Sequence, residues 1–464
     1  MPAPMYNVLF PVETINRELD FRLFLAAMFV NSNRRIYIGN MQRINRMIRN
    51  MYGGLYVGKH IFYRHPNVLR YYKCLKEKGF AYVYLQEEGA IFPGGEAQWR
   101  AELDRQAATD FVWLQPSDWL CHWGDFQNEY YRQRWPMLAA RMRATGHPRF
   151  DIYKPRFREY YAYEAQQLRD RYGCFLLINT NQSRGNNSRG IAGAFHPMLG
   201  YLSSDTAKHM RTVRLWAKSM NIIAGIVALV HRLHIEFPEL PIVLRPHPSE
   251  SIDFYRQAFR NIDNVHVVYE GPVGPWIIAA EALLHDGCTT AIEAHFADKP
   301  VISFRATDDP EFDQVVPNEI GARCRSEDDV LLAVDSMVRG RSVGLNASST
   351  VWGRRLLANF SHDAFGPLLE TMEEALSTVG PPRQCDGHLI VQAREAYARL
   401  RELPREWAAP LSRRKQARIA NHQKFYGFKQ DVIEHKLNTI QRLLNKPIRY
   451  WLLSDQLIVI EAAQ

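Results

Sequence analysis

The chain has 464 residues, of which 46% are hydrophobic, 12% aromatic and 23% charged. This composition is typical of a globular protein with more than one core, and it excludes intrinsic disorder, collagen-like repeats and a coiled coil. The net charge of +9 is uneven, because residues 401–464 hold 12 Lys and Arg against 6 Asp and Glu. The nearly neutral body argues against nucleic acid as a partner.

The cysteine pattern and the hydropathy indicate a cytoplasmic protein. The six cysteines show no C-x-x-C spacing, so neither a zinc ribbon nor a thiol redox motif is expected. No apolar run reaches the roughly 18 residues of a membrane-spanning helix, and the N-terminus lacks a signal-peptide pattern. We therefore expect reduced cysteines and cytoplasmic localisation.

The first 150 residues alternate short apolar segments with helical ones. The pattern predicts strands at NVLFPVE, RRIYIG, AYVYLQEEG and DFVWLQPSD, with a helix over 17–30 between the first two. A turn-rich stretch at 144–151 then interrupts this alternation. Strands that alternate with helices predict βαβ units and a parallel sheet.

The alternation resumes with the strand CFLLINTN, a helix through 216–233 and the strands PIVLRPHP and NVHVVYEG. The segment EALLHDGCTTAIEAHFADKPVISF predicts strand, turn, helix and strand. We predict an α/β fold with two doubly wound parallel-sheet domains, at 1–160 and 161–375, facing a cleft. A helical basic tail over 376–464 should follow. The carboxyl ends of the strands should line the cleft.

Two loops of the second domain are candidates for phosphate and nucleotide binding. Arg245, His247 and Ser249 follow a predicted strand, where a cation and helix N–H groups suit a phosphate oxygen. The alternative is a proline-rich turn with a surface histidine. In the second loop, Gly287 permits close backbone approach, and hydroxyl and carboxyl groups follow it at Thr289, Thr290 and Glu293. The alternative for Thr290 and Glu293 is ordinary helix capping.

Two weaker groups of residues complete the predicted site. Glu87 and Glu88 lie at a strand end in the first domain, where one carboxylate could act as general base or nucleophile; a solvated acidic loop is the alternative. Asn179 and Asn181 follow the strand CFLLI and could hold sugar hydroxyls, although Asn is also common in turns.

Several catalytic signatures are missing from the sequence. There is no G-x-x-x-x-G-K-[ST] loop, no G-x-S-x-G and no H-E-x-x-H. We therefore expect no metal site, no bound cofactor and a metal-independent reaction.

The motifs of the first domain resemble bacterial surface carbohydrate biosynthesis proteins. The resemblance rests on Val12-Glu13-Thr14, Arg17-Glu18-Leu19-Asp20 with Arg22-Leu23, Gly58-Lys59, Glu87-Glu88-Gly89 and Thr145 to Asp151, and it covers residues 8–375. It implies a GT-B-type glycosyltransferase, with a GT-B-like fold of two Rossmann-like domains that face a cleft. The elements R-P-H-P and G-C-T-T-A-I-E are similar to those of CDP-glycerol glycerophosphotransferases and of capsule and lipopolysaccharide Kdo transferases.

The resemblance implies roles for individual residues. His247-Pro248 would contact the donor phosphate, Thr289, Thr290 and Glu293 would bind the donor, and Glu87 or Glu88 would be the catalytic carboxylate. The chain would move a sugar from a nucleotide-sugar donor, such as CMP-Kdo, to a polysaccharide, lipopolysaccharide or lipid-linked acceptor. The alternatives are a CDP-polyol phosphotransferase of the same fold and a non-catalytic scaffold in polysaccharide assembly.

The tail admits two interpretations. Its basic residues, including Arg413-Arg414-Lys415, alternate with aromatics such as Phe425, Phe428 and Trp451. This composition suits peripheral contact with an anionic inner-membrane surface. The alternative is a segment that packs back on the domains and buries those aromatics.

Overall fold

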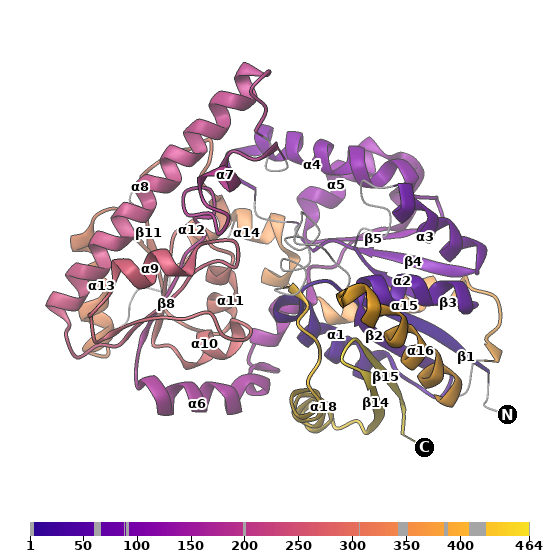
Figure 1. The fold of residues 1–464 in the computed structure, drawn as a ribbon. Coiled ribbons are helices and arrows are strands. Elements are labelled where there is room, and N and C mark those ends of the chain that lie inside the picture. The colour runs from indigo at the N-terminus through magenta and orange to yellow at the C-terminus, as the bar shows by residue number, and fades with distance from the viewer. Residues whose placement is uncertain are drawn as a thin grey trace. The chain divides into compact units, whose positions relative to one another are not determined.

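The chain folds into two compact units, shown in Figure 1. The computed structural model describes residues 4–59, 66–87, 89, 92–197, 201–305, 307–341, 351–384, 388–407 and 424–463. Unit 1 comprises Met1–Gly89, Leu103–Ile152 and Arg355–Gln464, and unit 2 comprises Ala90–Glu102 and Tyr153–Arg354. The chain thus leaves unit 1 close to the predicted boundary, but it returns before residue 375.

Within the described residues, unit 1 is built on a nine-stranded sheet of order β14-β15-β2-β1-β3-β4-β5-β6, with β13 paired to β1. Strands β1 to β6 pair with one another in parallel, whereas β13 and β15 pair antiparallel with β1 and β2. Their bounds are β1 (Pro4–Val12), β2 (Arg34–Asn40), β3 (Gly54–Gly58), β4 (Phe80–Leu85), β5 (Trp119–His122), β6 (Met142–Ala144), β13 (Arg383–Gln384), β14 (Ile448–Ser454) and β15 (Leu457–Ala462).

Helices flank this sheet, so its strands are apolar runs rather than alternating ones. Gly54 shows how closely β3 approaches β1, because a Cβ there would lie 1.9 Å from the Asn7 carbonyl oxygen. The helices that belong to unit 1 or begin or end in it are α1 (Ile15–Phe29), α2 (Met41–Met47), α3 (Pro66–Glu77), α4 (Glu96–Asp110), α5 (Asp125–Arg134), α14 (Val351–Leu356), α15 (Phe365–Ser377), α16 (His388–Trp407) and α18 (Gln430–Leu444).

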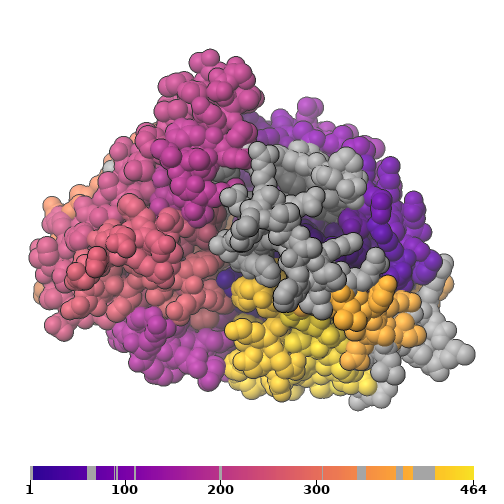
Figure 2. Space-filling view, viewed as in Figure 1, coloured from indigo at the N-terminus to yellow at the C-terminus, as the bar shows by residue number. Residues whose placement is uncertain are grey.

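The C-terminal segment is an integral part of unit 1. Strand β15 pairs antiparallel with β2, so the structure differs from the predicted helical tail over β14 and β15. Helix α18 packs against α1, and its Lys436 lies 2.9 Å from Asp20. Phe425 and Phe428 are buried, and Figure 2 shows the yellow C-terminal residues as one continuous surface. Arg413-Arg414-Lys415 lie outside the described residues.

Unit 2 contains a parallel sheet of six described strands in the order β12-β11-β10-β7-β8-β9. The bounds are β7 (Leu176–Asn179), β8 (Ile242–Arg245), β9 (Val265–Val267), β10 (Ala282–His285), β11 (Val301–Phe304) and β12 (Ala322–Cys324). The α helices are α6 (Ala162–Tyr172), α7 (Ile191–Ala194), α8 (Thr206–Glu236), α9 (Ile252–Ala258), α10 (Gly274–Ala279), α11 (Thr290–Phe296), α12 (Val315–Glu319) and α13 (Glu327–Val338). The predicted fold class, α/β with two parallel sheets, is confirmed.

Helix α8 is, among the described residues, the one element long and apolar enough to cross a membrane by length and composition. Its C-terminal half packs in the unit 2 core, where Ile226, Leu229 and Leu233 are buried against the β strands. A buried core helix meets the same criterion, so α8 is no more than weak evidence for a membrane span.

Candidate functional site

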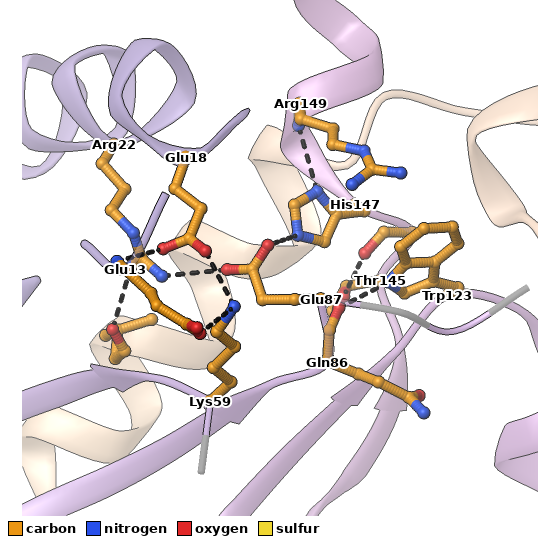
Figure 3. Close-up of polar contacts among 12 residues, drawn as sticks. Glu13, Glu18, Arg22, Lys59, Gln86, Glu87, Trp123, Thr145, His147 and Arg149 are labelled. Carbon is orange, nitrogen blue, oxygen red and sulfur yellow. Dashed lines mark hydrogen bonds and ion pairs between the residues drawn. The ribbon is translucent and has the colours of Figure 1, made fainter. Parts of the chain in front are cut away.

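Most motif residues of the first domain meet at the carboxyl edge of the unit 1 sheet (Figure 3). Glu13 follows β1, Lys59 follows β3 and Glu87 lies just beyond β4, while Glu18 and Arg22 come from α1 and His147 from the loop after β6. We call these six residues the unit 1 charged cluster. Because parallel strands end at one edge, motifs that are distant in sequence are brought together.

Lys59 is surrounded by carboxylates within this cluster. Its Nζ lies 2.8 Å from Glu18 Oε1 and 2.9 Å from Glu13 Oε2. Burial would lower the pKa of Lys59, but the negative charges of Glu18, Glu87 and Glu13 outweigh it and raise that pKa. Burial would raise the pKa of Glu13, but Lys59 and Lys424 lower it to about 2. The ion pairs therefore persist at neutral pH.

Glu87 and His147 form a buried pair. His147 Nε2 lies 3.2 Å from Glu87 Oε2, and Arg22 donates to Glu87 Oε1 at 2.9 Å. Burial would raise the pKa of Glu87, but His147, Arg22 and Lys59 hold it well below its usual range. Burial lowers the pKa of His147 to about 4. An ionised carboxylate therefore faces a neutral imidazole, whose Nδ1 accepts from the Arg149 N–H at 3.3 Å.

The loop that carries Glu87 is held tightly. The Trp123 indole N–H donates to the Gln86 carbonyl at 2.5 Å, and the Gln127 amide donates to the Gly89 carbonyl at 2.7 Å. A Cβ at Gly89 would lie 2.5 Å from Trp123. Glu87 itself is 3% exposed, so its geometry suits a positioning role better than nucleophilic attack. Glu88, the other predicted carboxylate, lies outside the described residues.

The motif from Thr145 to Asp151 attaches the returning chain to unit 1. The Asn359 amide donates to the His147 carbonyl at 3.0 Å and to Asp151 Oδ1 at 2.8 Å. Asp151 Oδ2 accepts from the backbone N–H of Ala364 at 2.6 Å and of Phe365 at 3.1 Å, where α15 begins. Asp151 of this motif therefore has a structural role, because it holds Asn359 and the start of α15.

Three polar residues end adjacent strands of the unit 2 sheet. Asn179 of β7 is paired in register with His285 of β10 on one side and with Arg245 of β8 on the other. The loops that follow are organised by the Glu250 carboxylate. This group accepts from the Thr180 hydroxyl at 2.8 Å and from the His247 N–H at 3.0 Å. The sequence analysis missed Glu250, although it stands in the same proline-containing loop as His247.

Arg245 and His247, predicted together as phosphate ligands, have different surroundings. The Arg245 guanidinium donates to the carbonyls of Glu270 at 2.7 Å and Gly271 at 3.1 Å, so it holds the loop after β9. His247 is exposed, and its Nδ1 accepts from the Ser249 N–H at 3.2 Å, which assigns the proton of the neutral ring to Nε2. Ser249 is exposed, and Ser251, not Ser249, precedes α9 as its N-cap.

The loop after β10 has the predicted turn but not the predicted cap. Gly287 has a φ of 62°, and its N–H donates to Asn318 Oδ1 at 2.8 Å. Thr289 occupies the N-cap position of α11 without a side-chain capping bond, so the capping alternative does not account for Thr290 and the buried Glu293. Helix α11 has 7 residues, so its dipole is small and anion binding here would depend on side chains.

Several buried polar atoms at this edge of unit 2 have no hydrogen-bond partner among the described residues. They include both amide atoms of Asn179, Nε2 of His285 and Oδ2 of Asp286. Asn179 is 4% exposed and His285 is 1% exposed. Since leaving a buried polar group unpaired is costly, such groups on neighbouring strand ends indicate a site completed by a ligand. Asn181 is half-buried in the loop beyond.

Asp286 is a functional candidate that the sequence analysis did not single out. Burial and Asp313 raise its pKa to about 7, although Lys218 and Arg305 oppose the shift. Lys218 and Arg305 both form ion pairs with Asp313. A carboxyl group that titrates near neutrality can serve as an acid or a base. Within the described residues, no group of three or more His, Cys, Asp and Glu side chains could hold a metal ion.

Comparison with known proteins identifies no family for this chain. No family model and no curated protein matches it. A solved structure of a variant of the wall teichoic acid polymerase TagF is similar at 11% identity, over 81% of this chain and 90% of that chain, with a TM-score of 0.48. The Methanocaldococcus jannaschii UDP-GlcNAc 2-epimerase in complex with UDP-GlcNAc and UDP is similar at 10% identity, over 80% and 99%, with a TM-score of 0.44. The S. aureus MnaA–UDP structure is similar at 10% identity, over 83% and 100%, with a TM-score of 0.45.

Proposed function

We propose that the chain is a nucleotide-dependent glycosyltransferase of surface-polysaccharide biosynthesis. The amide of Asn179 and Nε2 of His285 carry this proposal, because they are buried with no partner in the described part of the chain and need a polar ligand at the carboxyl edge of the unit 2 sheet. A nucleotide-activated sugar supplies the hydroxyl and phosphate oxygens for such a site. The acceptor is a surface polysaccharide, a lipopolysaccharide or a lipid-linked precursor, in keeping with the sequence resemblance.

The described residues divide the work of this reaction. Asn179 and His285 bind donor hydroxyls, and the exposed His247 donates its Nε2–H to a donor phosphate oxygen. Asp286 moves a proton at the reacting oxygen, as its near-neutral pKa allows. Glu87 holds the His147 imidazole in one tautomer and so acts as a positioning residue in unit 1. No step needs a resident metal ion.

Nucleotide binding tests the proposal directly. Isothermal titration of the full chain with CMP, CDP, UDP and GDP should find at least one saturable ligand. The change Asn179→Ala should weaken binding of that ligand about 10-fold, since a hydrogen bond in a buried site contributes about 1.4 kcal/mol, which is a tenfold change in Kd. Asn438→Ala on α18, an exposed amide in unit 1, is the matched control. If none of the four nucleotides binds, the proposal is wrong and a scaffold role is favoured.

His247 also fits the transfer of a phosphate-bearing polyol, because its exposed ring can contact a phosphate oxygen in either reaction. Analysis of the product for phosphorus separates the two reactions. A phosphodiester in the product would establish a CDP-polyol phosphotransferase and exclude simple sugar transfer.

A further inference from the structure

Helix α8 has two halves with different surroundings. Seven side chains between residues 219 and 233 are buried in unit 2, whereas Thr212 is the one buried residue of 206–218, a stretch that the structure describes throughout. Figure 1 shows this first half extending past the strands of the unit 2 sheet. A helix of a globular protein normally buries one apolar face. The first half of α8 is unusual because it buries almost none of its surface among the described residues.

Helix α7 and the segment after it pack onto this first half. The ring centres of Phe195 and Trp216 lie 5.7 Å apart, and those of Tyr201 and His209 lie 5.4 Å apart. We call residues 189–197 and 201–218 the α8 projection. The ring contacts hold the two segments together, so their exposed side chains belong to one surface.

The α8 projection exposes large apolar side chains. Ile191 is 68% exposed, Met210 48% and Leu202 43%. Helix α8 is also long and apolar enough to cross a membrane by length and composition. Its second half is packed in the unit 2 core, so the helix cannot pass through a bilayer while unit 2 stays folded. Its first half is available only to a surface that lies against it.

The α8 projection is rich in positive charge. Helix α8 contains no Asp or Glu before Glu236, its last residue. Four exposed cations occur in the projection, at Arg189, Lys208, Arg211 and Arg214. The parts of unit 2 outside the description are residues 90–91, 198–200, 306 and 342–350, and their sequences contain no Asp or Glu. Within unit 2, a compensating carboxylate must therefore come from a described residue.

Two carboxylates pair with these four cations in the described chain. Lys208 Nζ lies 3.0 Å from Asp205 Oδ2. Glu311 is shared, because Arg214 Nη2 lies 3.0 Å from its Oε2 and Arg211 Nε lies 3.6 Å from its Oε1. The Arg189 guanidinium has no ion-pair partner among the described residues. Four cations against two carboxylates leave an excess of two positive charges, which complements an anionic surface.

Cations beside non-aromatic apolar side chains suit the interface of an anionic bilayer. Lys and Arg side chains lay their apolar stems along a hydrophobic surface while the charged heads reach lipid phosphates. Exposed Leu, Ile and Met side chains enter the boundary between head groups and acyl chains. A single-stranded nucleic acid would instead favour exposed rings on which bases stack, and Ile191, Leu202 and Met210 have none. The surface therefore favours lipid.

We propose that the α8 projection docks the protein on an anionic lipid bilayer. Arg189, Arg211 and Arg214 contact lipid phosphates, and Leu202 and Met210 insert among the head groups. The contact is peripheral and reversible, because few charges and few apolar side chains take part. It does not depend on the donor site proposed for unit 2.

Vesicle flotation with the full chain tests the charges. The protein should bind vesicles of phosphatidylglycerol and phosphatidylcholine at low salt, and it should bind pure phosphatidylcholine much more weakly. Arg189→Ala/Arg214→Ala should weaken binding to the anionic vesicles at least 10-fold, since each cation near such a surface contributes a factor of about 5. Arg256→Ala/Arg260→Ala, which removes two exposed arginines elsewhere in unit 2, is the matched control and should bind as the wild type does.

A second pair of variants tests insertion. Leu202→Asn/Met210→Gln should also weaken vesicle binding, because it removes apolar surface and keeps every charge. Leu332→Asn/Val338→Asn on α13 removes equally exposed apolar side chains and should leave binding unchanged. Circular dichroism checks that each variant is folded. Hydrogen exchange in peptides that cover residues 201–218 should slow when anionic vesicles are added to the wild type.

Three outcomes would overturn the proposal. The first is a wild-type chain that does not bind anionic vesicles. The second is Arg189→Ala/Arg214→Ala binding as tightly as the wild type while Arg413→Ala/Arg414→Ala/Lys415→Ala loses binding, which would assign the membrane contact to the C-terminal region. The third is Leu202→Asn/Met210→Gln binding as the wild type does, which would indicate a surface for soluble polyanions or acidic proteins.

Discussion

At the scale of single residues, burial decides what each ionisable group can do. The Glu87 carboxylate is buried with Arg22, Lys59 and His147 around it, and it stays ionised. The Asp286 carboxyl group is also largely removed from water, but its neighbouring cations are engaged by Asp313, and its pKa rises to about 7. The first carboxylate is therefore suited to holding other groups in place and the second to moving a proton.

The raised pKa of Asp286 predicts a stability that falls as pH rises. The unfolded chain loses this proton near pH 4 and the folded chain near pH 7, so folding is penalised progressively between those values and the penalty levels off above about 7. Asp286→Asn should remove the penalty and stabilise the protein by a few kcal/mol at pH 8, and by much less at pH 5. Urea unfolding at both pH values measures the difference.

The control for this experiment is Asp253→Asn, an exposed aspartate on α9 whose replacement should change stability by less than about 0.5 kcal/mol at either pH. An Asp286→Asn variant that is equally destabilised at pH 5 and pH 8 would show that the carboxyl group is not protonated in the folded protein.

Removing the charge of Glu87 should destabilise unit 1. Glu87→Gln removes one negative charge from beside the buried cations Arg22 and Lys59. Because an uncompensated buried charge is costly, the free energy of unfolding should fall by about 3–5 kcal/mol. Urea unfolding at pH 7.5 tests the expectation, with Glu129→Gln on the surface of α5 as the matched control. Equal stability of the two variants would contradict the role assigned to the unit 1 charged cluster.

At the scale of elements, the C-terminal hairpin shows where a local pattern is ambiguous. The run LIVIEA is short and apolar, and such a run does not distinguish a buried strand from a helix segment. Its conformation is decided by pairing with β2, which lies about 400 residues earlier in the sequence. Strand β15 in turn covers what would otherwise be the open edge of β2.

The pairing of β15 predicts that the C-terminal residues are needed for the stability of unit 1. Ile460→Ala removes a fully buried side chain and should cost about 2–5 kcal/mol. Val432→Ala on the exposed face of α18 should cost much less. Thermal unfolding of the two variants measures the contrast. Equal melting temperatures would mean that the hairpin adds little to the core.

The sequence predicts more of the fold than of the site. Buried parallel strands are apolar runs between helices, so segments such as FLLIN and PIVLR are recognisable without tertiary information. Glu250 and Asp286 are not, because their partners come from other loops and helices that only the folded chain brings near. The sequence places Glu87 at the end of a strand, but its burial beside His147 cannot be predicted from the neighbouring residues in sequence.

At the scale of the whole molecule, neither unit is one continuous stretch of chain. Residues 90–102 belong to unit 2 although unit 1 flanks them on both sides in sequence, and the Gly94 N–H donates to the Asp313 carbonyl at 3.0 Å. Asp313 also pairs with Lys218 and Arg305 beside Asp286. The crossing segment therefore helps to hold the loops of the proposed donor site, and residues 153–354 alone would lack this support.

This organisation predicts that a nucleotide ligand stabilises unit 2 selectively. At a free ligand concentration of 100 times Kd, binding raises the free energy of unfolding of the folded state that binds by about 2.7 kcal/mol. Hydrogen exchange should therefore slow, in the presence of the tightest of the four nucleotides, in peptides that cover residues 176–182 and 282–290, which carry Asn179 and His285. It should also slow in peptides that cover 90–102, because this segment is hydrogen-bonded to Asp313. Peptides of the β14–β15 hairpin serve as the internal control, because the hairpin lies in unit 1 and contains no residue proposed to contact the nucleotide. Protection that appears in the hairpin but not in these unit 2 peptides would place the nucleotide elsewhere and remove Asn179 and His285 from the site.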